Sequence, residues 1–408
     1  MNISLDTKHP LPMLALIALA AATFMSITIE MMPSGLMHLM APELQVQHSD
    51  IGNLVSVFAL TVVLTSTPLV LLFARIPKRT LLVVVLTIFA IGTIFTALAP
   101  NYALVVVSRV VTGVAHGVFW ATVTAYTATI VQPEQVMKAV SITGGGGSLA
   151  FVLGVPISTS LGQWLGWRAA FIAVAGGCLA VVLILLVVLP KGRPGKQPVT
   201  TGAIDTEAVV SALQGPQHSL RMVTLVCILT AIVMCGQYSF YSYNAPYLLH
   251  EVAITEAQLP VAQFGYGIAS ALAAMATGML FTSRPKSGWY LTAVIMLVGG
   301  AVVTIFAEVQ PVALAGFVLW GAGMGFMPVL LQARLLAAAA ARQRDLAAAL
   351  YNTGFNVGIA SGSYLGGVLL TSFGMRAPGW AFMGLIALSI LLSIAIDLRQ
   401  RKSAASAE

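Results

Sequence analysis

Residues 168–189 read RAAFIAVAGGCLAVVLILLVVL, and no charged residue follows Arg168 in this run. About 20 apolar residues in a helix span the ~30 Å hydrocarbon core of a bilayer. Similar runs recur along all 408 residues. Of these, 58% are hydrophobic and only 8% charged, against about 25% charged in soluble domains. The composition therefore predicts an all-α membrane protein that crosses the bilayer many times.

Twelve such runs can be delimited on either side of one polar stretch. We expect spans at 12–40, 50–74, 79–98, 102–131, 137–162, 168–189, 220–248, 255–282, 287–307, 310–340, 344–371 and 375–398. The polar stretch at 190–219 divides them into two sets of six. This division predicts an N-terminal six-helix bundle at 1–189, a cytoplasmic linker at 190–219 and a C-terminal six-helix bundle at 220–408.

The positive charges indicate the orientation of the chain. The net charge is +7, and all but three of the 20 lysines and arginines fall on one face of this layout. The exceptions are Arg109, Arg168 and Arg376. Because loops rich in Lys and Arg stay inside the cell, both termini are expected in the cytoplasm, with the chain in a bacterial inner membrane. Since topology explains the basic charge, we expect the lipid bilayer and not a nucleic acid as partner, and we expect a monomer.

The two sets of spans look like copies of each other. Glycines of the fourth and fifth spans, and an arginine after the fifth, recur about 208 positions later in the tenth and eleventh spans. The recurring pairs are Gly113 and Gly321, Gly117 and Gly325, Gly154 and Gly362, and Arg168 and Arg376. Duplicated halves predict a pseudo-twofold axis along the membrane normal, with the working site between the halves.

Glu30 is the acid that stands out inside a span. A charge at the bilayer centre is costly, so such a residue is a functional candidate. Thr23, Ser26 and Ser34 share its helix face and indicate a wet side of the first span. One interpretation is that Glu30 takes up and releases a proton as its exposure alternates. The other is that it caps or pairs structurally, since Pro33 is expected to break the helix just after it.

Arg109 is the basic residue that lies within a span, and it shares a face with Gly113, His116 and Trp120. A buried guanidinium needs a carboxylate, a carbonyl or water, and Glu30 is a plausible partner. His116 is a candidate proton relay because imidazole titrates near neutral pH. It can equally be a hydrogen-bonded interior residue.

Polar and aromatic side chains of the C-terminal half are candidates for the substrate cavity. Gln237, Tyr241 and Asn244 share one face of the seventh span, and Asn352 and Asn356 lie one turn apart in the eleventh. With Trp120, such groups can hold an uncharged or cationic solute by hydrogen bonds and stacking. The alternative is that they bond helix to helix.

The sequence lacks the motifs of several other classes of protein. No phosphate-binding G-x-x-x-x-G-K-[ST] loop and no hydrolase motif is present, so we expect neither an ATPase nor another enzyme. The cysteines lie in apolar runs without metal-ligand spacing, so we expect no metal and no cofactor. The glycine run 144–147 and the pair Gly154 and Pro156 indicate close packing or a kink.

Four segments resemble the major facilitator superfamily. Glu30-x-x-Pro33-x-Gly35-Leu36 resembles a signature of bacterial exporters in this family. Arg109-x-x-x-Gly113-x-x-His116-Gly117 resembles its fourth-span motif in the sugar- and arabinose-efflux branch. Residues 154–168, with G-V-P and G-W-R, and residues 351–358, with F-N-x-G, resemble its fifth and eleventh spans. The resemblance covers nearly the whole chain.

The loop between the second and third spans departs from the family pattern G-x-x-x-D-R-x-G-R-[RK]. Here Arg75, Lys78 and Arg79 keep the basic positions, while Val70 and Ala74 replace the glycine and the aspartate. That acid normally helps to latch the cytoplasmic gate, so the gate must be held otherwise.

The resemblance implies a proton-coupled antiporter that exports drugs, sugars or related small molecules by alternating access. The candidate proton-coupling residues are then Glu30, Arg109 and His116. Gating and packing residues would be Arg75, Lys78, Arg79, Gly113, Gly117, Gly154 and Pro156. The residues alone leave an importer or facilitator of a small solute as the alternative.

Overall fold

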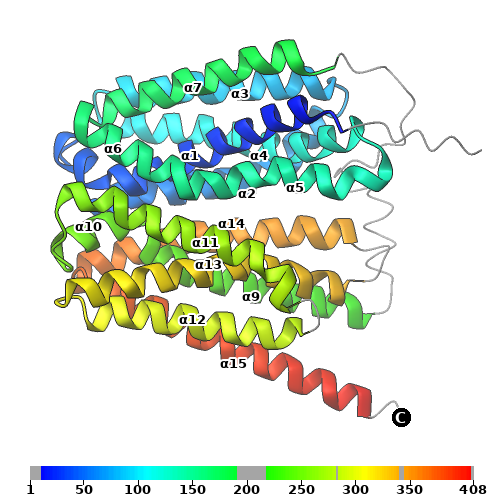
Figure 1. Ribbon diagram of the computed structural model, residues 1–408, viewed down its shortest axis with the longest axis vertical. Coiled ribbons are helices and arrows are strands. Elements are labelled where there is room, and N and C mark those ends of the chain that lie inside the picture. The colour runs from blue at the N-terminus through cyan, green and yellow to red at the C-terminus, as the bar shows by residue number, and fades with distance from the viewer. Residues whose placement is uncertain (1–10, 191–216, 282–283, 340–343, 406–408) are drawn as a thin grey trace, which may run out of the picture.

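The computed structural model describes residues 11–190, 217–281, 284–339 and 344–405. All regular secondary structure in these ranges is helical, which confirms the expected fold class. The helices form two bundles that lie against each other, α1–α7 in one and α9–α15 in the other (Figure 1). The predicted linker at 190–219 falls almost wholly outside the described residues, and α9 begins within it, at Gln217.

The N-terminal bundle contains six membrane-crossing paths, one of which is built from three pieces. Its elements are α1 (Met13–Glu43), α2 (His48–Leu72), α3 (Lys78–Leu98), α4 (Tyr102–Thr129), the short η1 (Pro133–Gln135), α5 (Val136–Leu149), the π-helix η2 (Ala150–Gly154), α6 (Val155–Leu165) and α7 (Trp167–Val188). The fifth span is thus α5, η2 and α6 in series.

The C-terminal bundle follows the same plan. Its elements are α9 (Gln217–Tyr241), α10 (Asn244–His250), the short η3 (Glu256–Gln258), α11 (Leu259–Phe281), α12 (Pro285–Ile305), α13 (Gln310–Ala338), α14 (Arg344–Phe373) and α15 (Ala377–Ala405). Here the seventh span is built from two pieces, α9 and α10.

Eleven helices of the described chain are long and apolar enough to cross a membrane. The twelfth path is α14, which has 30 residues but carries polar side chains such as Asn352, Asn356 and Ser361. It packs against α2 of the other bundle and α9 of its own, so less of its surface has to face lipid.

The recurring glycines lie where helices cross closely. Gly113 and Gly117 of α4 pack against α2, and a Cβ on Gly117 would come 2.9 Å from that of Ser66. In the other bundle, a Cβ on Gly321 would come 2.5 Å from the Tyr266 carbonyl of α11, and one on Gly325 would overlap the Ser270 carbonyl. Small residues let helix backbones approach in membranes. The first glycine pair therefore brings α4 close to α2, and the second brings α13 close to α11.

Backbone features repeat at the spacing of the sequence repeat. Gly166 and Gly374, 208 positions apart, have φ angles of 84° and 89°. In this left-handed region glycine carries no Cβ penalty, and each residue sits in the turn before the last helix of its bundle. Gln45 and Ala253, again 208 apart, have φ angles of 55° and 56°.

The turns at one end of the molecule carry acids, and this end is called the acidic end below. The carboxylates are those of Glu43, Asp50, Glu251, Glu256 and Glu308. At the opposite or basic end, α1 begins, α15 ends and the side chains of Arg75, Lys78, Arg79, Arg284 and Arg334 lie.

Each bundle is clasped at the acidic end by the same ion pair. Arg168 Nε lies 2.7 Å from Glu43 Oε1, and Arg376 Nε lies 2.5 Å from Glu251 Oε2. Both partners are displaced by 208 positions. Arg376 also binds Glu308 at 3.2 Å, and the hydrogen bonds to Glu251 and Glu308 hold the pKa of Arg376 above its usual range. The clasps tie the first helix of each bundle to its last.

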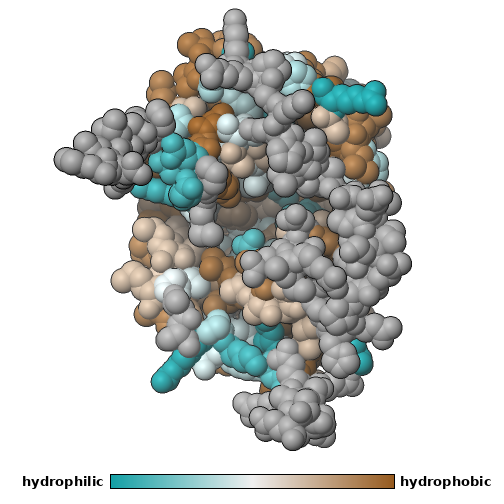
Figure 2. Space-filling model, turned by 90° about the vertical axis from the view of Figure 1, so that its right-hand side faces the viewer, coloured by the Kyte–Doolittle hydropathy of each residue, from teal (hydrophilic) through white to brown (hydrophobic). Residues whose placement is uncertain are grey.

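The seam between the bundles is closed toward the acidic end. Ser363 Oγ of α14 donates to the Gly52 carbonyl of α2 at 2.8 Å, and Tyr243 fills the space above Gly52 and Gly367. Nearby, η2 packs on α11 at Gly267. At the basic end the surface is hollowed between the two bundles (Figure 2).

We predict that Gly325→Ala destabilises the protein, because the added methyl group would overlap the Ser270 carbonyl. Overpacking of this kind costs about 1–3 kcal/mol. Gly384→Ala in α15 is the matched control, since no atom lies within 4 Å of its added Cβ. Thermal unfolding of both purified variants in detergent measures the effect. Equal midpoints for Gly325→Ala and Gly384→Ala would contradict the close crossing of α11 and α13.

Candidate functional site

The first helix is continuous through Pro33, contrary to the expectation that this proline breaks it. Proline has no N–H, so the carbonyl of Ile29 four positions earlier loses its helical donor. Arg109 of α4 supplies the missing donor: its Nη1 lies 2.9 Å from the Ile29 oxygen and its Nη2 lies 2.9 Å from the Glu30 oxygen. Helix α1 therefore runs on to Glu43, and Glu30 lies near its middle.

Arg109 is fully buried, and its guanidinium carbon lies 4.4 Å above the centroid of the Phe58 ring. This ring of α2 was missed by the sequence reasoning, because a phenylalanine in an apolar run gives no signal of its own. Glu30 was the expected partner of Arg109. The structure brings the two residues together, but the contact is to the main chain of Glu30, and the carboxylate is left for other partners.

The Glu30 carboxylate faces His116. Glu30 Oε2 lies 3.7 Å from His116 Nε2, and Ser26 Oγ lies 3.1 Å from His116 Nδ1. Glu30 is 3% and His116 6% exposed. The 3.7 Å separation is longer than a hydrogen bond, so a small shift can make or break the contact. The arrangement links two groups that can each carry a proton.

Trp120 lies one turn beyond His116 on α4, and their ring centroids are 6.1 Å apart. It is half-buried, and a Cβ on Gly147 would lie 3.6 Å from its ring. Gly147 of α5 thus packs beside this indole, whereas an added Cβ on Gly144 or Gly145 would meet no atom within 4 Å. Gly146 of the same run meets the Ala20 backbone of α1.

The Gln237 amide is already occupied inside the C-terminal bundle. Its Nε2 donates to the Tyr266 hydroxyl at 2.9 Å, and its Oε1 accepts from Trp320 Nε1 at 2.8 Å. Tyr241 packs nearby, with its ring tilted by 34° to that of Tyr266 and the two centroids 5.0 Å apart. Tyr266 and Trp320 were missed, because their distance from Gln237 in the sequence hides the contact. A role of Gln237 and Tyr241 in binding substrate stays a prediction.

Asn244 is buried at the start of α10, where its Oδ1 accepts from Gln263 of α11 at 3.2 Å. Asn352 is exposed and Asn356 half-buried on α14, and Asn356 Nδ2 donates to the Asn352 carbonyl at 3.0 Å. The structure does not join these two asparagines to the Asn244 pair by any hydrogen bond among the described residues.

Tyr241 touches the seam itself. Its ring centroid lies 6.3 Å from that of Phe151, which belongs to the π-helix η2 of the other bundle. Gly154 ends η2, where a Cβ would overlap Thr28 of α1, and Pro156 follows at the start of α6. The glycine and proline expected to give a kink thus lie at the C-terminal end of a one-turn π-helix, a feature often found at functional sites.

The basic loop after α2 has one anchored side chain. Arg79 donates to the Leu186 carbonyl of α7, whereas Arg75 is exposed and Lys78 half-buried. These three residues stay candidates for gating.

An acid at the basic end escaped the sequence reasoning. Asp397 of α15 accepts from Arg334 at 2.6 Å and from the Tyr290 hydroxyl at 2.8 Å, and Lys286 lies 4.0 Å away. The signal was available, since an isolated aspartate among basic residues invites pairing. The network ties α12, α13 and α15 together.

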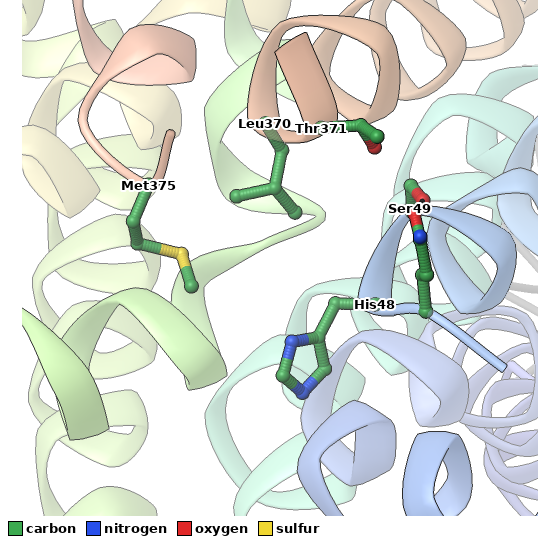
Figure 3. A pocket seen from close by; sticks show the side chains of 6 residues that line it. His48, Ser49, Leu370, Thr371 and Met375 are labelled. Atoms are coloured by element: carbon green, nitrogen blue, oxygen red, sulfur yellow. Dashed lines mark hydrogen bonds between the residues drawn. The ribbon is translucent and has the colours of Figure 1, made fainter. Parts of the chain in front are cut away.

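A small cleft of about 310 Å³ opens in the seam at the acidic end. Figure 3 shows His48 and Ser49 reaching it from α2, and Leu370 and Thr371 from α14. The cleft is lined by the acidic-end turns and not by Glu30 or Arg109. In the described chain, no three His, Cys, Asp or Glu side chains are placed to hold a metal ion.

A model of the family described as Major Facilitator Superfamily matches residues 19–243 and again residues 226–408. The chain belongs to this family. It is a multi-pass secondary transporter and not an enzyme, and the resemblance of its motifs is confirmed.

Several relatives of this superfamily member are named as efflux proteins. A probable sugar efflux transporter of Helicobacter pylori (strain P12) is 25% identical over 402 residues, 98% of this chain and 100% of the relative. A chloramphenicol efflux pump of Mycobacterium tuberculosis is 31% identical over 363 residues, 86% of this chain and 84% of the relative.

The fold also matches solved structures of the superfamily. A bacterial homologue of the human lysosomal transporter Spinster, in an inward-facing and unoccupied conformation, superposes with a TM-score of 0.72. The match covers 95% of each chain at 15% sequence identity. At this identity the likeness shows the fold alone.

We predict that Arg109→Lys destabilises this transporter, because an ammonium group cannot serve both carbonyls in the fork geometry of Arg. A buried carbonyl left without a donor costs about 1–3 kcal/mol. Adding Pro33→Ala should recover part of the loss, since residue 33 then donates to the Ile29 oxygen. Thermal unfolding in detergent measures both the loss of stability in Arg109→Lys and its recovery in the double variant.

The control replaces Pro42, the other proline inside α1, which lies away from Arg109. Pro42→Ala should leave the cost of Arg109→Lys unchanged. If Pro33→Ala and Pro42→Ala act alike on the Arg109→Lys variant, Arg109 does not compensate for Pro33.

Proposed function

We propose that this protein is a proton-coupled exporter of small solutes, drugs or sugars among them, that works by alternating access. We place it as a monomer in a bacterial inner membrane with the basic end and both termini in the cytoplasm. The proposal depends on one observation at α1: the main chain and the side chain of Glu30 have different partners. Arg109 binds main-chain carbonyls, which leaves the Glu30 carboxylate to exchange a proton beside His116.

The position of Glu30 supports this role. A carboxylate at mid-membrane is costly unless it has a partner. In the described chain Glu30 forms no ion pair with a lysine or arginine, although the buried Arg109 guanidinium acts on it electrostatically. His116 is its contact, and Ser26 orients that ring. A proton reaching Glu30 from one side and leaving to the other would drive the solute in the opposite direction.

The seam supports alternation between two open states. It is closed at the acidic end by Gly52, Ser363 and Tyr243, and the surface is hollowed at the basic end (Figure 2). With the basic end in the cytoplasm, this is the state that loads a solute from inside. Opening the acidic end would release it outside.

The C-terminal bundle favours an uncharged or amphipathic solute. The Gln237 and Asn244 amides bond to their own bundle, and the rings of Tyr241 and Phe151 meet at the seam. Aromatic surfaces bind apolar and weakly polar solutes. The similarity to a probable sugar efflux transporter and to a chloramphenicol efflux pump supports this class of solute and supports export.

The alternative is an importer or facilitator of a small solute with the same fold. The geometry of Glu30 and His116 serves either direction, so the names of the relatives carry the choice. Transport measured with and without an imposed proton gradient separates the two.

We predict that Glu30→Gln abolishes coupling between solute and proton movement, because an amide cannot release a proton. In everted vesicles, proton efflux on adding chloramphenicol or a panel of sugars should be lost when followed with a pH-sensitive dye. Glu256→Gln is the control, since Glu256 is exposed at the acidic end. Full coupling in Glu30→Gln would remove Glu30 from the mechanism.

We predict that a disulfide between Cys residues at positions 49 and 367 arrests transport. A Cβ on Gly367 would lie 3.4 Å from that of Ser49, close to the roughly 3.5–4.5 Å that a disulfide needs, and 2.6 Å from the Tyr243 hydroxyl, which must shift to admit it. The double variant Ser49→Cys with Gly367→Cys should lose transport under oxidant and regain it under reductant. The two single variants control for the substitutions. Unchanged transport with the crosslink formed would refute alternating access through this seam.

A further inference from the structure

Three histidines from three helices gather at the acidic end of the seam. His38 belongs to α1 and His48 to α2, whereas His250 ends α10 of the other bundle. The rings of His48 and His250 face each other across the seam with centroids 6.2 Å apart. His38 lies near enough to interact electrostatically with both. We call these residues the histidine cluster.

His38 is the least satisfied member of the histidine cluster. Both of its ring nitrogens are buried, and in the described part of the chain they make no hydrogen bond of normal geometry, although the Gly35 backbone one turn earlier interacts with the ring. Buried polar atoms are paired in the great majority of cases, so an exception calls for an explanation. His250 is exposed, and His48 and His38 are half-buried, so the cluster leads from water at the acidic end to an imidazole whose two nitrogens are buried.

The acids around the histidine cluster are engaged elsewhere. On α1, Glu43 binds Arg168 and Trp167. On α2, the Asp50 carboxylate accepts from the Gln47 backbone. At the end of α10, Glu251 binds Arg376. On α14, the cleft beside His48 is lined by Leu370 and Thr371, which do not titrate.

We propose that the histidine cluster is a second proton-binding site, separate from Glu30, whose occupation opens the acidic end of the seam. Two imidazolium rings at about 6 Å repel each other, and the repulsion acts between the bundles because His48 and His250 belong to different ones. The neutral cluster lets the seam close through Gly52 and Tyr243. A water-exposed imidazole takes up a proton in mild acid, whereas burial disfavours the charged ring, so acid outside the cell would favour the open seam over the closed one.

The consequence for transport is one of timing. Outside acid would open the acidic end when protons are abundant there, so Glu30 would become accessible from the side that supplies them. The inference rests on the proposed opening of the seam, and it does not depend on any particular solute.

The test measures the width of the acidic end directly. Spin labels are placed at Trp164→Cys and Phe373→Cys, in a background with Cys178, Cys227 and Cys235 replaced by alanine. Trp164 and Phe373 are 79% and 76% exposed, and they belong to different bundles. Pulsed electron paramagnetic resonance in lipid nanodiscs then reports the populations of the closed and open seam.

The titration is done in the Glu30→Gln variant, so that protonation of Glu30 cannot contribute. From about pH 8 to about pH 5.5, a range that spans the titration of histidine, the ratio of open to closed seam should rise about tenfold or more. Replacing His38, His48 and His250 together by glutamine should abolish the rise. An equal rise in this triple variant, or none in its parent, overturns the proposal.

A gain of charge supplies an independent arm. His48→Lys with His250→Lys carries two charges throughout the titrated range, and the seam should be open even at the alkaline end of the titration. Thermal unfolding checks that this variant is folded. A closed seam in the folded variant counts against the proposal. If chelator alone removes the acid response, the cluster acts through a bound metal ion and the proton site is wrong. None of these readouts depends on coupling through Glu30, which the vesicle experiment tests separately.

Discussion

Arg109 keeps α1 continuous at the point where its sequence would break it. The guanidinium takes the place of the N–H that Pro33 lacks, and it does so from a neighbouring helix. In a bilayer an unpaired carbonyl has no water to turn to, so this contact fixes α4 against α1. It also fixes the depth of Glu30 in the membrane. Because Arg109 and His116 share one face of α4, it fixes the distance from the Glu30 carboxylate to the His116 ring as well. Fold and site therefore share one interaction.

The contacts across the seam differ in kind from those within each bundle. Within each bundle, helices cross at glycines such as Gly117 and Gly325 and are clasped by Arg168 or Arg376 at the acidic end. Between the bundles, contact depends on shape. Tyr243 fits over Gly52, and few polar bonds cross, such as that of Ser363. Strong bonds inside the bundles and a weakly bonded seam favour movement of the two halves as units.

The sequence carries the global pattern better than the local chemistry. Run lengths predicted the helical paths, and the 208-residue offset of Arg168 and Arg376 reappears in backbone angles as well as side chains. The motifs also pointed to Glu30, Arg109 and His116, which the structure brings together. What the pattern could not reveal is which atoms meet. The expectation that Pro33 ends the helix failed because its remedy lies about 80 positions away, and the occupied amide of Gln237 depends on Trp320 in another helix.

The placement of the clasps has a further consequence. In the described part of the chain, every ion pair joins two side chains of the same bundle. Dissolved salt screens exposed charges over about 10 Å at moderate ionic strength, so it weakens the clasps and leaves the packed seam untouched. While the histidine cluster is uncharged, salinity should thus act on how firmly each half holds together and very little on which end of the molecule is open. In that state, a cell whose surroundings vary in salt would keep the same balance between the two open states.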